Sequence, residues 1–178
     1  MKKAEVYLHQ TDLQIADFNS IQEKLIKSIE SSRSQKCEVH IFPELFLCGY
    51  PLQDLCLQRP FHQSYQDHLA KTEIQLKKIK KNNPFILLMG GLSYEFSDSN
   101  MPLKIFNSLY SFASDKGILK AIYHKQLLPN YDIFDEKKYF TPGTEIGHLQ
   151  WNDINFGLQI CEDMWASNFH QDDPCINL

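Results

Sequence analysis

The chain has 178 residues, of which 43% are hydrophobic and 22% are charged, and its formal net charge at pH 7 is -4. This size and composition are typical of one globular domain with a sizeable core, and they exclude an intrinsically disordered chain. Acidic and basic residues are mixed along the sequence, without a basic stripe or a polybasic cluster. We therefore expect neither nucleic acid nor an anionic membrane as a partner, and a small molecule as the ligand.

Signals for membranes, secretion and metals are also missing from the sequence. No apolar run approaches the roughly 20 residues that cross a bilayer, and the start, MKKAEVYLHQTD, has no long apolar segment of the kind found in signal peptides. The five cysteines show no C-x-x-C pair, which favours neither a disulfide framework nor a zinc site (Cys37, Cys48, Cys56, Cys161 and Cys175). We expect a cytoplasmic protein with no metal site, in which at least one cysteine could be a reactive thiol.

The N-terminal part of the chain predicts two strands separated by an amphipathic helix. Lys3 to Leu8 is the first predicted strand. Apolar residues then recur at steps of three and four, which predicts a helix with Asp17 or Asn19 as its N-cap. The apolar run from Val39 to Phe42 predicts a strand covered on both faces, and Pro43 ends it because proline has no N–H to donate.

A second helix and a third strand follow. The helix is predicted from about Phe61 to the lysine-rich KKIKK, which we interpret as a solvated face. Its inward-facing side chains are expected to be Phe61, Tyr65, Leu69, Leu76 and Ile79. Pro84 to Met89 predicts a third strand that closes on Gly90 and Gly91.

Two hairpins complete the predicted elements. Asn107 to Ala113 is expected to pair with Ile118 to His124 across a Ser-Asp-Lys-Gly turn. Leu149 to Trp151 is expected to pair with Asn155 to Ile160 across a tight Asn-Asp turn. The final letters, CINL, look like the start of another buried strand. Because no repeat or linker interrupts the pattern, it predicts one domain, or one piece of a domain.

Three reactive side chains stand where predicted strands end. Glu44 follows the second strand, Lys125 follows the strand that ends at His124, and Cys161 follows the last strand. They are far apart in sequence, so they can meet only if these strands lie in one sheet. A cysteine has an ordinary pKa near 8.5, and a nucleophilic thiol therefore needs a base or a positive field.

This trio suits amide hydrolysis through a thioester. Glu44 could take the thiol proton and later give it to the leaving amine, while Lys125 would lower the thiol pKa and stabilise the oxyanion. The sequence has no G-x-S-x-G, G-x-G-x-x-G, Walker or H-E-x-x-H motif. Each residue also has an ordinary alternative role, as a capping carboxylate, a surface lysine or an inert core thiol, and spacing alone leaves both interpretations open.

The sequence segments that contain these three residues resemble the motifs of a known family. FPELFLCGYPLQDL, HKQLLPNYDIFDEKKYFTPG and FGLQICEDMW, in this order, are similar to the three signature blocks of the carbon–nitrogen hydrolase (nitrilase) superfamily. The resemblance implies Glu44 as general base and acid, Lys125 as oxyanion stabiliser and Cys161 as nucleophile. The fold it implies is of the α+β class, a four-layer α-β-β-α sandwich of the nitrilase type. Residues 1–178 would be an incomplete carbon–nitrogen hydrolase domain.

Within the superfamily, these blocks look like the N-terminal glutaminase domain of glutamine-dependent NAD synthetases. That resemblance implies a glutamine pocket lined by Tyr131, Glu136, Glu162 and Trp165. An acidic group would pair with the α-ammonium of glutamine, and an aromatic wall would pack on its methylenes. Without the motif, core packing explains Tyr131 and Trp165 equally well.

The same resemblance implies that two domains catalyse successive reactions. This chain would release ammonia from glutamine, and a synthetase domain absent from it would use ATP and Mg to amidate deamido-NAD. We expect no cofactor in this chain itself, and a homo-oligomer in the full-length protein. Two alternatives stay open: another nitrilase-type amidase that acts on ω-amides or N-carbamoyl compounds, and a non-catalytic fragment of the fold.

Overall fold

The computed structural model describes residues 4–32, 39–79, 83–98 and 101–165. Its helices and strands, with η for a short 3-10 helix, are β1 (Val6–Leu8), α1 (Phe18–Ser31), β2 (Val39–Ile41), η1 (Gln53–Leu57), α2 (Arg59–Lys78), β3 (Ile86–Phe96), β4 (Pro102–Ala113), β5 (Ile118–His124), η2 (Glu136–Lys138), β6 (His148–Trp151), β7 (Ile154–Gly157) and η3 (Cys161–Trp165). Most of these elements were predicted, with bounds that differ by a few residues. Lys3 and the final CINL lie outside the described residues.

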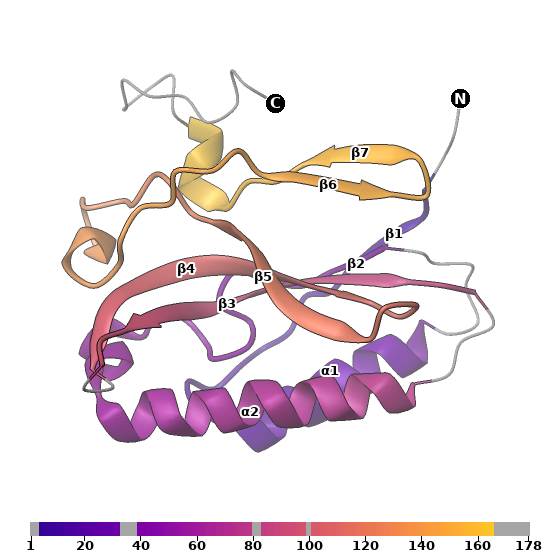
Figure 1. The fold of residues 1–178 in the computed structure, drawn as a ribbon, viewed down its shortest axis with the longest axis horizontal. Coiled ribbons are helices and arrows are strands. Elements are labelled where there is room, and N and C mark those ends of the chain that lie inside the picture. Colours follow the sequence, from indigo (N-terminus) through magenta and orange to yellow (C-terminus); the bar gives the residue numbers. More distant parts are fainter. Residues whose placement is uncertain (1–3, 33–38, 80–82, 99–100, 166–178) are drawn as a thin grey trace.

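Five strands form one mixed sheet in the order β1-β2-β3-β4-β5. β1, β2 and β3 run parallel, whereas β4 is antiparallel to both β3 and β5. β2 and β5 therefore point in the same direction and end at the same edge of the sheet (Figure 1). This topology brings Glu44 and Lys125 to one edge, because each residue follows the end of one of these strands.

Helices α1 and α2 cover one face of the sheet (Figure 1). The Asp17 carboxylate accepts the Ser20 N–H at 3.1 Å and caps α1, as one of the two predicted caps. Between helices and sheet lies the larger core, whose most buried members include Leu25, Ile29 and Phe112. Helix α2 begins at Arg59, two residues before the predicted start, because Pro60 is well tolerated in a first helical turn.

The predicted end of the third strand is wrong: β3 continues through Gly90 and Gly91 to Phe96. A Cβ atom at Gly90 would lie 2.3 Å from the Leu45 nitrogen and 2.7 Å from the Glu44 carbonyl carbon. Gly90 therefore does not end the strand but allows another backbone to approach it closely, whereas Gly91 makes room for buried side chains, the nearest being that of Tyr65. The backbone that approaches is the one that carries Glu44.

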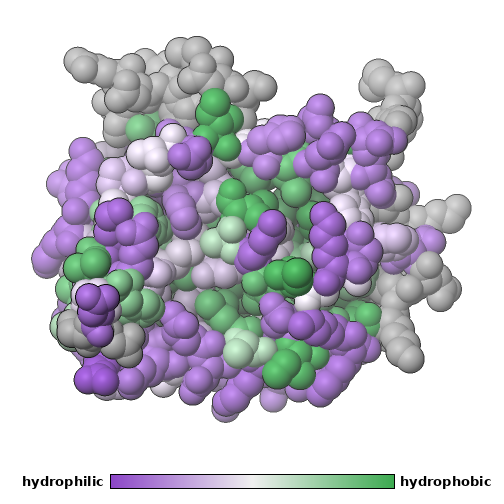
Figure 2. Space-filling model, viewed as in Figure 1, coloured by the Kyte–Doolittle hydropathy of each residue, from purple (hydrophilic) through white to green (hydrophobic). Residues whose placement is uncertain are grey.

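The hairpin β6–β7 packs over the opposite face of the sheet (Figure 1). Trp151 and Leu158 from this region share a second, smaller core with Ile86 and Leu88 of β3. The predicted strand to Ile160 is too long, because β7 ends at Gly157 and the chain then turns toward Cys161. In the same view, apolar side chains gather in the middle of the molecule, and hydrophilic residues surround them (Figure 2).

The α+β class is confirmed by these layers. The described residues supply a helical layer, the five-stranded sheet and, on its other face, a two-stranded hairpin. They correspond to an incomplete α-β-β-α sandwich, as the sequence predicts. None of the helices in the described part of the chain is long and apolar enough to span a membrane.

Candidate active site

Glu44 lies in a turn that is tied down across β3. The Gly90 N–H donates to the Pro43 carbonyl at 3.2 Å, and the Leu47 N–H donates to the Gly90 carbonyl at 2.9 Å. Leu45, the next residue, has a φ of 50°, a left-handed backbone conformation that residues other than glycine seldom adopt. The turn thus leaves the ladder directly after β2 and holds the backbone of Glu44 against β3.

Lys125 is the fully buried cation of this site. Its backbone follows β5, and its N–H donates to the Asn107 carbonyl at 2.8 Å. The side chain is 0% exposed, and Nζ lies 2.7 Å from Oε1 of Glu44. Burial alone would lower the lysine pKa, but the carboxylates of Glu44 and Glu136 outweigh it and raise that pKa above its ordinary value. Lys125 is therefore a charged ammonium at neutral pH, as an oxyanion stabiliser must be.

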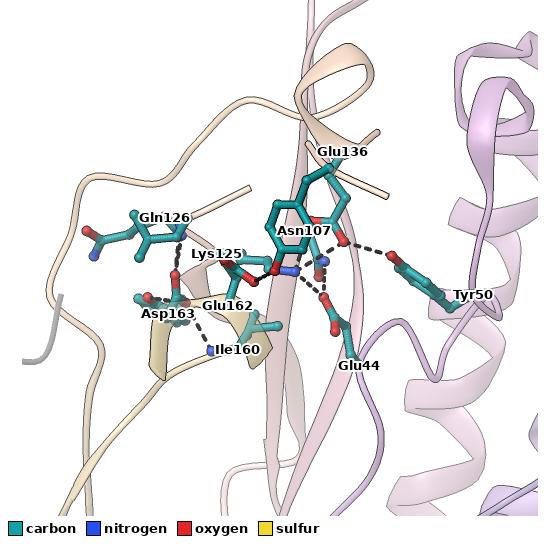
Figure 3. A network of polar contacts seen from close by, with 12 residues as sticks. Glu44, Tyr50, Asn107, Lys125, Gln126, Glu136, Ile160, Glu162 and Asp163 are labelled. Atoms are coloured by element: carbon teal, nitrogen blue, oxygen red, sulfur yellow. Dashed lines mark hydrogen bonds and ion pairs between the residues drawn. The ribbon is translucent and has the colours of Figure 1, made fainter. Parts of the chain in front are cut away.

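Glu136 is the second carboxylate beside this lysine (Figure 3). It begins η2, and its two oxygens lie 3.1 and 2.9 Å from Lys125 Nζ. The Tyr50 hydroxyl also donates to Oε1 of Glu136, at 3.1 Å. Burial raises the pKa of this carboxyl and Lys125 opposes that shift. In the structure the Glu136 carboxylate contacts Lys125 and Tyr50 and holds the lysine in place, and its predicted contact with substrate stays a prediction.

Cys161 opens the short turn η3 and borders the same cavity as Glu44. The cavity has a volume of about 250 Å³ and is otherwise lined largely by apolar side chains. Cys161 has a φ of 47°, and backbone strain of this kind clusters at functional sites. Burial and the charge of Glu44 raise the thiol pKa, and the opposing effect of Lys125 does not overcome them. The resting thiol is therefore protonated and needs a base.

The remaining predicted residues lie around this turn. The Tyr131 hydroxyl donates to Oε2 of Glu162, the residue that follows Cys161, at 2.8 Å. Glu162 is buried, whereas Tyr131 is about half exposed. Trp165 ends η3 and is 52% exposed, so its packing against the methylenes of glutamine stays a prediction.

Asp163 was missed by the sequence analysis, although it stands inside the ICED motif. Its carboxylate is fully buried and accepts the backbone N–H groups of Gln126, Leu127 and Ile160 at 2.8 to 3.1 Å. It also accepts the Tyr123 hydroxyl at 2.8 Å. Asp163 thereby ties the segment after Lys125 to the segment before Cys161 (Figure 3).

The family model described as carbon–nitrogen hydrolase matches residues 7–170. The chain belongs to the carbon–nitrogen hydrolase family. This membership accounts for the fold. The expectation that the strands before all three residues share one sheet is wrong, because β7, which precedes Cys161, pairs only with β6 among the described residues; Cys161 nevertheless borders the same cavity as Glu44, which contacts Lys125.

Relatives within the family include two glutamine-dependent NAD(+) synthetases. The one from Acinetobacter baylyi is 30% identical over 94% of this chain, and the one from Thermotoga maritima is 33% identical over 93%. The chain spans only 28% and 26% of their lengths. What the complete relatives do therefore applies to this chain only as a proposal.

Solved structures of an NAD+ synthetase and of an amidase share the fold of this chain. The NAD+ synthetase from Acinetobacter baumannii superposes with a TM-score of 0.77 at 30% identity, covering 94% of this chain and 29% of that one. An amidase from Nesterenkonia sp. superposes with a TM-score of 0.70 at 20% identity, covering 90% of this chain and 56% of that one. At that lower identity the likeness establishes the fold alone.

Proposed function

We propose that this chain is the glutamine-hydrolysing portion of a glutamine-dependent NAD synthetase. The observation that carries the proposal is the buried ammonium of Lys125, held by two carboxylates beside a cavity that a cysteine and Glu44 share. The similarity to NAD synthetases supports the choice of glutamine as the substrate. The reaction releases ammonia and glutamate.

In the first half of the reaction, Sγ of Cys161 attacks the carboxamide carbon of glutamine. Glu44 takes the thiol proton as the S–C bond forms, and the carbonyl π electrons move onto oxygen. Lys125 stabilises this oxyanion because its charge is fixed and shielded from water. Collapse of the intermediate breaks the C–N bond, and the protonated Glu44 gives its proton to the departing ammonia. A thioester is left on Cys161.

In the second half, water replaces ammonia. Glu44, again a carboxylate, takes a proton from the water that attacks the thioester, and Lys125 stabilises the second oxyanion. Cleavage of the C–S bond returns the proton to the thiolate. Glu44 therefore acts twice as base and twice as acid, while Lys125 keeps its proton throughout.

Substrate recognition falls to the residues next to the nucleophile. Glu162 is a buried carboxylate that suits the α-ammonium of glutamine, and Tyr131 orients it through the 2.8 Å hydrogen bond. Trp165 would have to pack on the substrate when it binds, because 52% of it is exposed without substrate. Glu136 would act on the substrate only through Lys125.

The rest of the NAD-forming reaction would take place outside this chain. A synthetase domain would use ATP and Mg to amidate deamido-NAD with the ammonia released by this chain. Such a protein would work in the cytoplasm, and we propose a homo-oligomeric full-length form. These statements rest on the similarity to the complete NAD synthetases, of which the chain covers about 28%.

The proposal is tested by ammonia release from L-glutamine, L-asparagine, acetamide and an N-carbamoyl amino acid. We expect glutamine to react fastest, and Cys161→Ala to abolish its hydrolysis while leaving the fold intact, since the residue is exposed. Faster turnover of another amide would favour an ω-amidase or carbamoylase. Unchanged hydrolysis in Cys161→Ala would rule out the nucleophile. A folded chain that releases no ammonia from any of them would indicate a non-catalytic fragment.

A further inference from the structure

Asn107 lies in the middle of β4 and contacts both Glu44 and Lys125 (Figure 3). It is 1% exposed. Its side-chain Nδ2 donates to Oε1 of Glu44 at 2.6 Å, and its backbone carbonyl accepts the Lys125 N–H at 2.8 Å. The backbone contact is independent of the side chain, so a substitution can remove the first contact and keep the second.

The two oxygens of Glu44 are not equivalent. Oε1 accepts hydrogen bonds from Asn107 Nδ2 and from the Lys125 ammonium. Within the described ranges no donor contacts Oε2, and 22% of the Glu44 side chain is exposed. An oxygen that already binds an amide and an ammonium is the poorer proton acceptor. The proton of the Cys161 thiol should therefore be transferred to Oε2.

The geometry of the Asn107 amide is unfavourable for stability alone. Its Oδ1 is buried and has no hydrogen-bond partner among the described residues. Leaving a buried acceptor unpaired costs roughly 1–3 kcal/mol. An amide placed only to stabilise the core would use both of its polar atoms, whereas this one uses the single atom that faces Glu44.

We propose that Asn107 is a positioning residue, which holds Oε1 of Glu44 and thereby presents Oε2 to the thiol of Cys161. This role rests on the proposed function, because it acts through the base of that reaction. In this role Asn107 acts through Glu44 and not directly on the substrate. A single side chain on β4 thus selects the oxygen of Glu44 that carries the proton.

The test compares Asn107→Ser, which removes the contact, with Asn107→Asp, which replaces a donor by a second carboxyl group. Asn155→Asp is the matched control, because Asn155 lies exposed on β7. Glu44→Gln shows how fast ammonia release and Cys161 alkylation proceed when the proposed base is absent. Circular dichroism checks folding, and the Asn107→Ser result alone decides if the Asp variant does not fold.

Two readouts are followed across pH. One is kcat and KM for ammonia release from glutamine, and the other is alkylation of Cys161 by iodoacetamide, quantified from the mass of its peptide. Alkylation needs no turnover, so it reports on the site even if glutamine is not the substrate. The charged or titratable groups near Glu44 that contribute to these profiles are Tyr50, Lys125, Glu136 and Cys161.

We expect both Asn107 variants to slow Cys161 alkylation at pH 7 by about 10-fold and to lower kcat with little change in KM. We expect their acid limbs to lie at higher pH, by about one pH unit in Asn107→Asp, because a carboxylate loses a donor or gains a like charge. Profiles identical to those of wild type and Asn155→Asp, with slow alkylation in Glu44→Gln, would overturn the role of Asn107 alone. If Glu44→Gln also alkylates like wild type, the base assignment and this role fall together.

Discussion

The helix-covered face of the main sheet and the edge where β2 and β5 end are stabilised by different kinds of interaction. On the helix-covered face, buried apolar side chains such as Leu25, Ile29 and Phe112 fill the space between α1, α2 and the strands. At the edge where β2 and β5 end, the buried groups are instead Lys125, Glu136 and Asp163, together with polar partners. One sheet therefore joins an apolar core to a buried ionic network.

Because of this difference, we expect substitutions in the two regions to affect stability and activity differently. Apolar packing is not directional and tolerates substitutions that keep the volume. A buried ionic network depends on every partner, because an unpaired buried charge is expensive. Changes in the helix-covered core should reduce stability and spare the chemistry of the folded molecules, whereas changes in the network should impair both.

Lys125→Met should have the largest effect. It leaves Glu44 and Glu136 facing each other without the cation, and we expect unfolding free energy to fall by about 3–5 kcal/mol. Hydrolysis of glutamine should fall by about 10³-fold because the oxyanion loses its partner. Urea unfolding and ammonia release measure the two effects. The double variant with Glu136→Gln should regain part of the stability and none of the activity; a stable, active single variant would contradict the network.

Leu25→Ala tests the other region. Leu25 is fully buried in the helix-covered core, and deleting its methyl groups should lower unfolding free energy by about 3 kcal/mol. Under conditions where the variant stays folded, its hydrolysis rate per folded molecule and its Cys161 alkylation profile should match wild type. Altered pH profiles at equal folded fraction would mean that the core and the site are coupled.

Gly90→Ala tests the contact that joins the two regions. The new methyl group would meet the backbone of Pro43, Glu44 and Leu45, so the turn must shift. We expect a loss of about 1–3 kcal/mol in stability and of about 10²-fold in hydrolysis, because Glu44 moves. The control is Gly117→Ala, where the nearest atoms are 3.5 Å away and φ is +65°. Gly117→Ala should lose about 1 kcal/mol of stability and keep its activity. If the two variants hydrolyse glutamine at the same rate, Gly90→Ala does not displace Glu44.

His68→Gln should have the smallest effect near pH 7, and its effect on stability should appear only as the pH falls. Burial on α2, with Lys71 nearby, lowers the His68 pKa to about 4. As pH falls from about 6.5 toward 4, the unfolded chain binds a proton that the folded chain does not, so stability declines by up to about 1.4 kcal/mol per pH unit. Thermal unfolding should show a shallower decline in His68→Gln. The matched change His148→Gln, at an exposed position on β6, should keep the wild-type dependence of stability on pH. The same dependence in wild type and both variants would exclude His68 as its source.

Local pattern was enough to predict much of the fold, and it singled out Glu44, Lys125 and Cys161, whose catalytic roles stay a proposal. Apolar steps of three and four gave α1 and its Asp17 cap, and the Ser-Asp-Lys-Gly turn gave the hairpin of β4 and β5. Gly90 was misjudged because a glycine that ends a strand and one that admits another backbone look alike in a sequence. Only the contact with Glu44 distinguishes the two cases.

Most helices and strands, and the residues with reactive groups, can be predicted from the sequence, because periodicity and the position of a residue after a strand are local properties. Which groups those residues face depends on the packing of distant segments. This packing paired Lys125 with two carboxylates, raised the thiol pKa of Cys161 instead of lowering it, brought Asn107 against Glu44, and bound Asp163 to the segment after Lys125. Such effects depend on distance and burial between residues far apart in the chain, which only the order and direction of the strands establish.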